Sequence, residues 1–180
     1  MRIRNFVTAS VFALVSATAF AQDVKTDFDK AADYGAIKTF SIKVGTGWGN
    51  SMSEARVTTE ITEALTSKGW AKAEEGKADA IVVLHGATQL KHELNTFYSG
   101  GYGGYRYRGF GATAGTATTT TSEYTVGTLV VDIFDAKNKQ LIFRGTATDE
   151  LSDKQDKNAK KLAKASDKMF KDFPPGSAKK

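Results

Sequence analysis

The sequence contains no cysteine, two histidines and two prolines among its 180 residues. The absence of cysteine excludes disulfides, thiolate zinc sites, iron–sulfur clusters and a thiol nucleophile. Two histidines leave few candidates for metal binding or acid–base catalysis. The remaining composition, with 41% hydrophobic and 25% charged residues, is typical of a globular protein. A chain of this length is expected to bury one self-sufficient core.

The first 21 residues are typical of a secretory signal peptide. Met1–Asn5 is short and basic, residues 6–20 are mainly apolar, and Ala19-Phe20-Ala21 is a small-x-small pattern that predicts cleavage before Gln22. The apolar run is shorter than the roughly 20 residues of a membrane span, although an N-terminal anchor helix is the alternative. We therefore expect a periplasmic or secreted protein. It is not expected to be lipid-anchored, because no cysteine follows the run.

The remaining chain is expected to form a single α+β domain over residues 22–175, followed by a tail at 176–180. Alternation and apolar runs predict strands at about 23–28, 37–44, 80–97, 127–135 and 141–148. Apolar residues at helical spacing predict helices after Ser51, with Ser51 and Glu54 as a capping box, and from about Asp153 to Phe173. The expected architecture is a mostly antiparallel sheet of about five strands with two helices packed on one face.

The strand at 127–135 and the strand at 141–148 are expected to form a β-hairpin. Alternation predicts that their apolar residues face the core: Leu129, Val131, Ile133, Leu141, Phe143, Gly145 and Ala147. This register places Asp132 and Arg144 on the other face, opposite or diagonal to each other. We interpret them as a structural pair that fixes the strand register.

Three stretches resemble a bacterial envelope family catalogued as domain of unknown function 4136. They are Asp27-Phe28-Asp29 with 37–40, residues 127–136, and residues 141–147, and the terminal Phe173-Pro174-Pro175 extends the resemblance. The resemblance covers essentially the whole chain after the signal peptide and implies an exported single domain. It carries no catalytic residues to transfer. The sequence departs from the family pattern in having no lipoprotein cysteine, and in having Phe143 and Lys139 where a Trp and a turn Gly are common.

Residues that could support catalysis are scattered along the chain. His85 and His92 are an odd number of residues apart, so on one strand they point to opposite faces. The sequence lacks both the helical zinc-protease motif and the nucleophile elbow of the hydrolases. The Asp residues at 27, 29 and 33 are typical of a turn, and no calcium-binding loop follows them. We therefore predict no enzyme activity, no metal and no cofactor.

A loop rich in Gly, Tyr and Thr is predicted at about 98–122. Aromatic and arginine side chains alternate there with glycine, which offers flat and cationic contact groups. One interpretation is a flexible excursion between two strands, and the other is a recognition loop. Export argues against a nucleic-acid partner. The candidate contact residues are Tyr98, Tyr102, Tyr105, Arg106, Tyr107, Arg108 and Phe110.

Excess positive charge is concentrated near the C-terminus, where nine Lys and four Asp lie between Ser152 and Lys180. Five of the lysines recur at steps of four and three and form a basic helix face: Lys157, Lys161, Lys164, Lys168 and Lys171. This face is either simply solvated or makes weak contact with an anionic membrane surface or another envelope polymer.

Together these features predict an exported, non-catalytic cell-envelope protein, a small interaction domain whose partner is an envelope protein or polymer. The first alternative is a periplasmic module that binds a small molecule or glycan through the aromatic-Gly loop. The second alternative is an enzyme, for which the sequence offers no recognisable carboxylate site. Clustered exposed tyrosines would favour the binding module, and a deep pocket with paired carboxylates would favour the enzyme.

Overall fold

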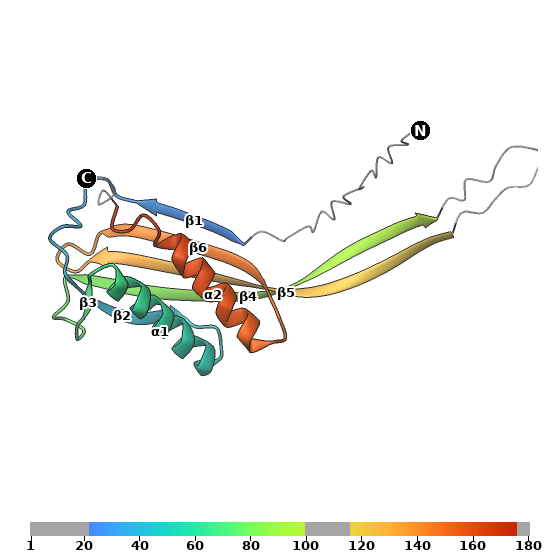
Figure 1. The fold of residues 1–180 in the computed structure, drawn as a ribbon, viewed down its shortest axis with the longest axis horizontal. Helices are drawn as coiled ribbons and strands as arrows, with labels where there is room; N and C mark the ends of the chain where they lie inside the picture. Colours follow the sequence, from blue (N-terminus) through green and yellow to red (C-terminus); the bar gives the residue numbers. More distant parts are fainter. Residues whose placement is uncertain (1–21, 100–115, 176–180) are drawn as a thin grey trace, which may run out of the picture.

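The computed structural model describes residues 22–99 and 116–175. Within them, two helices lie side by side on one face of a twisted sheet, and two of the strands extend far beyond the helices (Figure 1). The predicted signal peptide and the tail at 176–180 lie outside the described residues. The elements are β1 (Asp23–Phe28), β2 (Thr39–Thr46), α1 (Ser51–Ser67), β3 (Ala71–Lys72), β4 (Ala80–Ser99), β5 (Thr116–Asp135), β6 (Leu141–Leu151) and α2 (Gln155–Met169).

The sheet has six strands in the order β1-β6-β5-β4-β2-β3. The predicted α+β class is confirmed, but the prediction of about five strands is wrong, because the two-residue β3 is added at one edge. Pairing is antiparallel from β1 to β4 and parallel between β4 and β2 and between β2 and β3. The parallel pairs arise because α1 carries the chain from β2 back to the same end of the sheet before β4 begins.

Helix α1 packs through the apolar stripe that its spacing predicts, with Val57, Ile61 and Leu65 buried. The predicted capping box is wrong in its capping residue. The Asn50 side chain accepts from the backbone N–H groups of residues 52 and 53, at 3.0 and 3.2 Å. An Asn at this position satisfies the same unpaired donors as a serine would. Gly69 follows the helix at φ +90°, the left-handed conformation that commonly ends a helix.

Helix α2 closes the other half of the core. Its buried residues are Ala165, Ser166 and Met169, and the chain after it contributes two aromatic rings. Phe170 stacks on Phe143 of β6 with ring centroids 5.8 Å apart. Phe173 packs edge-on against four rings, those of Tyr34, Trp70, Phe143 and Phe170. This aromatic cluster holds the chain after α2 against the sheet at the end opposite the long strands.

The predicted loop at 98–122 is shorter than the sequence suggested. Strand β4 continues to Ser99 and β5 begins at Thr116, and the two strands pair over their whole length, from Ala80 with Asp135 to Ser99 with Thr116. The threonine run therefore lies in a strand, as expected for a β-branched residue that packs well on a pleated surface. Among the residues described, no helix is both long and apolar enough to cross a membrane.

Candidate functional site: a cavity beneath the helices and a projecting hairpin

A cavity of about 190 Å³ lies between the two helices and the sheet, at the end of the body from which the long strands project. Its wall is mainly apolar and comes from both helices, from β5 and β6 and from the segment before α1. The apolar lining includes Trp48, Val57, Leu129, Ala147, Leu162 and Ala165. The first turns of α1 and α2 border the same cavity through Ser53 and Gln155.

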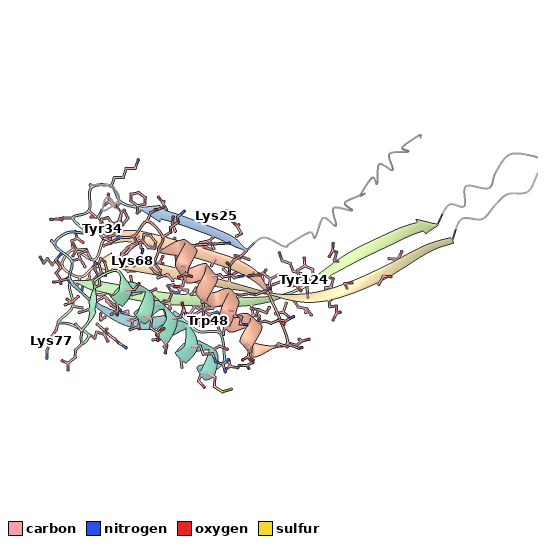
Figure 2. All side chains as sticks on the ribbon, viewed as in Figure 1. Lys25, Tyr34, Trp48, Lys68, Lys77 and Tyr124 are labelled. Atoms are coloured by element: carbon pink, nitrogen blue, oxygen red, sulfur yellow. The ribbon has the colours of Figure 1, made fainter. Side chains whose placement is uncertain are left out.

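Two glycines shape the sheet near the cavity. A Cβ atom at Gly86 would lie 1.9 Å from the Trp48 ring, so the indole rests directly on the backbone of β4. A Cβ atom at Gly127 would lie 2.9 Å from the side chain of Leu151. The Glu54 carboxylate also fixes the segment before α1, because it accepts a hydrogen bond from the backbone N–H of Trp48 at 3.1 Å. Figure 2 shows Trp48 at the end of the helical layer, close to the start of the long hairpin.

Polar side chains also line the cavity. The Lys161 ammonium donates to Asp149 at 3.0 Å and to the Glu150 carbonyl at 2.6 Å. Gln22 donates through Nε2 to the Lys161 carbonyl at 2.7 Å, but its buried Oε1 accepts no hydrogen bond. The Arg56 guanidinium donates to the side chain of Gln155 and so links the two helices. The cavity therefore combines an apolar wall with an edge at which Lys161 already neutralises the Asp149 carboxylate.

The second feature is a two-stranded arm, formed by residues 91–99 of β4 and 116–124 of β5 (Figure 1). Strand β2 pairs with β4 only as far as His85, and β6 pairs with β5 only as far as Thr125. Both outer edges of the arm therefore lack a neighbouring strand among the described residues. Leu90 near its base is 59% exposed. Figure 2 places Tyr124 at the junction of arm and body.

The predicted pair, Asp132 and Arg144, lies on the sheet face that the helices leave open. The two residues are directly opposite in register, and Arg144 donates from Nε and Nη2 to the two carboxylate oxygens, each at 2.6 Å. The Asp132 side chain is 4% exposed, whereas that of Arg144 is 53% exposed. The hydrogen bond and the charge of Asp132 raise the pKa of the guanidinium above its ordinary value. The carboxylate is thus occupied by a bidentate partner.

The predicted inward residues of β6 need one correction. The register shifts by one residue between Ile133 and Phe134, which leaves Ile142 as the extra residue of a bulge. Ile142 is buried together with Phe143, whereas Leu141 is only half-buried. A bulge breaks strict alternation, so a rule based on period two assigns Leu141 to the core and misses Ile142.

His85 lies next to this pair. Its Nε2 atom is 3.9 Å from Asp132 Oδ2, and its Nδ1 atom accepts from the Thr46 N–H at 3.2 Å. His92 instead lies on the arm, with Nδ1 3.1 Å from the Glu123 carboxylate. The two histidines therefore have separate partners. Nowhere in residues 22–99 and 116–175 do three or more His, Cys, Asp or Glu residues form a group that could hold a metal ion.

The candidate residues of the aromatic-Gly segment fall mostly outside the described residues, because only Tyr98 belongs to β4. Tyr102, Tyr105, Arg106, Tyr107, Arg108 and Phe110 are among those that lie outside. The basic helix face is described. Lys157, Lys164, Lys168 and Lys171 are exposed, but Lys161 is half-buried at the cavity edge. Ala165 and Met169, which directly follow Lys164 and Lys168, are buried, and Lys171 lies beyond the end of α2.

Sequence reasoning did not predict the cavity. Its wall joins residues from five separate segments, and no local pattern reports on a gap between packed helices. The nearest signal was the pair Gly86 and Gly127, because a glycine within a strand often marks close approach by another group.

Comparisons with known proteins bear on the fold and the family. The model of the family described as Domain of unknown function (DUF4136) matches residues 24–175. A PDZ domain protein from Parabacteroides distasonis is similar in structure, with a TM-score of 0.53, 17% identity, and coverage of 86% of this chain and 36% of that one. A PelC dodecamer from Paraburkholderia phytofirmans aligns with a TM-score of 0.46 and 12% identity, over 81% of this chain and 94% of that one. No curated protein matches the sequence.

Proposed function

This chain belongs to the DUF4136 family, and we propose that it is an exported, non-catalytic cell-envelope protein that binds a protein or polymer partner through its arm. The observation that carries the proposal is the arm itself. Strands β4 and β5 have 20 residues each, although the body needs only about half of that length to complete its sheet.

A two-stranded ribbon with free edges suits binding better than stability. Isolated two-stranded hairpins are marginally stable in water, and an uncovered edge presents unpaired N–H and C=O groups that can pair with another extended chain. Within residues 22–99 and 116–175, no third strand pairs with either edge of the arm. A partner that adds a strand to either edge would bury these groups and stabilise the ribbon.

Export is supported by the position of the first described strand. The predicted cleavage precedes Gln22, and β1 begins at Asp23, so cleavage there would leave every described helix and strand intact. Mass spectrometry of protein purified from the envelope is expected to find an N-terminus at Gln22. An intact Met1 on that protein would contradict the proposal.

A non-catalytic role is supported by the two least exposed of the ion-paired carboxylates, because each of them already binds a cation. Asp132 is held by Arg144, and Asp149 is 17% exposed and bound to Lys161. A general acid or base needs a group free to exchange a proton with substrate, and both carboxylates already have cationic partners. The exposed lysines of α2 suit weak, salt-sensitive contact with an anionic membrane surface as a secondary interaction.

The arm proposal is tested by shortening the hairpin. Replacing residues 91–124 with an Asn-Gly turn keeps Leu90 opposite Thr125 and leaves the core untouched. The shortened protein is expected to keep its circular dichroism spectrum and to lose the partners that the full chain captures from the envelope fraction. The control variant replaces Lys164 and Lys168 with Gln and should keep those partners. Retention of every partner by the shortened protein would refute the role of the arm.

A further inference from the structure

The cavity beneath the helices is large enough to hold a ligand. Its volume of about 190 Å³ exceeds that of the roughly 150 Å³ engineered cavity that takes up benzene when lined only by apolar side chains. Leu129, Ala147 and Ala165 are 7%, 6% and 3% exposed, so they supply a dry wall from the sheet and from α2. Trp48 closes the end next to the arm.

This wall suits an aliphatic chain. It offers carbon on several sides, and the two cations of its lining, Arg56 and Lys161, supply charge beside that carbon. A chain that lies against this wall loses contact with water on the side that faces the sheet and the helices, while a polar head group can remain in solvent. The shape and chemistry therefore match a single-chain amphiphile better than a sugar, which needs hydrogen-bonding partners on every side.

The charge at the edge selects the head group. Lys161 and Asp149 neutralise each other at 3.0 Å. Arg56 has no carboxylate partner among the ion pairs of the described residues, and its contact is with the neutral Gln155 amide. Among the described residues, Arg56 is therefore the cation of the cavity lining that no carboxylate neutralises.

We propose that this cavity binds a straight-chain carboxylate amphiphile, with the aliphatic chain inside the cavity and the carboxylate at Arg56. The site lies on the helix-covered face of the sheet and uses no residue of the distal arm. The cavity proposal can therefore be tested separately from the arm proposal, and the arm-shortened protein should still bind the amphiphile.

The first test is a chain-length series. The full purified chain is titrated with straight-chain carboxylates from butanoate to dodecanoate below their micelle concentrations, using calorimetry and intrinsic tryptophan fluorescence, to which Trp48 and Trp70 both contribute. Affinity is expected to rise by about fourfold for each methylene that enters the cavity and then to level off once the cavity is filled. Affinity that does not depend on chain length would overturn the proposal.

The second test fills the cavity. Ala165→Leu adds side-chain volume at the wall and is expected to weaken decanoate binding by about tenfold or more. The control is Ala55→Leu, which adds the same group at an exposed position of α1 outside the cavity. If Ala165→Leu does not fold, Leu162→Trp fills the same space from the half-buried side of α2. Unchanged decanoate binding in a folded cavity-filling variant would refute the site.

The third test addresses the head group. Arg56→Gln is expected to weaken decanoate binding by about fivefold at low salt, because an exposed ion pair contributes modestly, and to leave the binding of decanol unchanged. Equal loss for both ligands, or no loss for decanoate, would overturn the assignment of the carboxylate to Arg56.

Discussion

The ion pair between Asp132 and Arg144 allows a quantitative test of how the open face of the sheet is stabilised. Its two members differ in environment, since the Asp132 side chain is 4% exposed and the Arg144 side chain is 53% exposed. Removing one partner of a fully buried pair costs about 3–5 kcal/mol, whereas an exposed pair contributes about 0–1 kcal/mol. The cost of breaking this pair should therefore depend on which partner is removed.

Arg144→Met retains most of the aliphatic stem but leaves a buried carboxylate without its bidentate donor. We expect it to lower the free energy of unfolding by about 2–4 kcal/mol, less than for a fully buried pair because water can reach the guanidinium side. Asp132→Asn leaves an arginine that can hydrate, so the expected loss is about 1–2 kcal/mol. The double variant should lose less than the sum of the two single variants, because its second change breaks no remaining contact.

The measurement is urea denaturation followed by circular dichroism at neutral pH, with equal denaturant slopes for all variants. Lys25→Met is the matched control, because Lys25 pairs with Asp23 at 3.0 Å on the exposed edge strand and should cost about 0–1 kcal/mol. The reasoning is refuted if Arg144→Met costs no more than Asp132→Asn, or if the two losses add fully. Asp132→Asn should leave decanoate binding unchanged, since Asp132 lies on the face opposite the cavity.

Three further substitutions test other parts of the fold. Gly145→Ala should lower the free energy of unfolding by about 1–3 kcal/mol, because the added Cβ would lie 2.3 Å from Met169 Sδ in the core; thermal denaturation would measure it, and an unchanged Tm would contradict the packing. Lys139→Gly should raise the free energy of unfolding by about 0.5–1 kcal/mol. Lys139 adopts φ +62°, and the strain of this conformation for a residue with a side chain exceeds the entropic cost of ordering a glycine there. A loss of stability would refute this. Burial raises the pKa of Tyr34 to about 12, so its contribution to stability is complete below pH 10 and is lost as the pH rises through 12; Tyr34→Phe should weaken stability at neutral pH and flatten this alkaline decline, as followed by denaturation at several pH values.

Local patterns in the sequence predicted much of the body. The apolar spacing of Val57, Ile61 and Leu65 located α1, and alternation along the hairpin placed Asp132 and Arg144 on one face. These features depend only on the periods of helix and strand, which neighbouring residues determine.

The remaining features depend on contacts between distant segments. β3 is a strand only because Ala71 and Lys72 lie next to β2, and two residues carry no periodicity. The bulge at Ile142 depends on how β6 meets its neighbours. The cavity arises from the spacing of two helices over the sheet, which no single stretch of sequence encodes. The early start of β5 was missed for a different reason, because the threonine run was interpreted from its simple composition rather than from its preference for strands.

The position of β1 has a consequence for how the chain folds. Among the described residues, β1 is the first strand in the sequence, and it pairs with β6, from Asp23 with Thr148 to Phe28 with Phe143. Contacts between such distant segments require closure of a loop that spans most of the domain, which slows folding. When the N-terminus emerges first, from a ribosome or from a translocation channel, the sheet cannot be completed until β6 has also emerged. The first described strand therefore stays unpaired until the last described strand, β6, has been made.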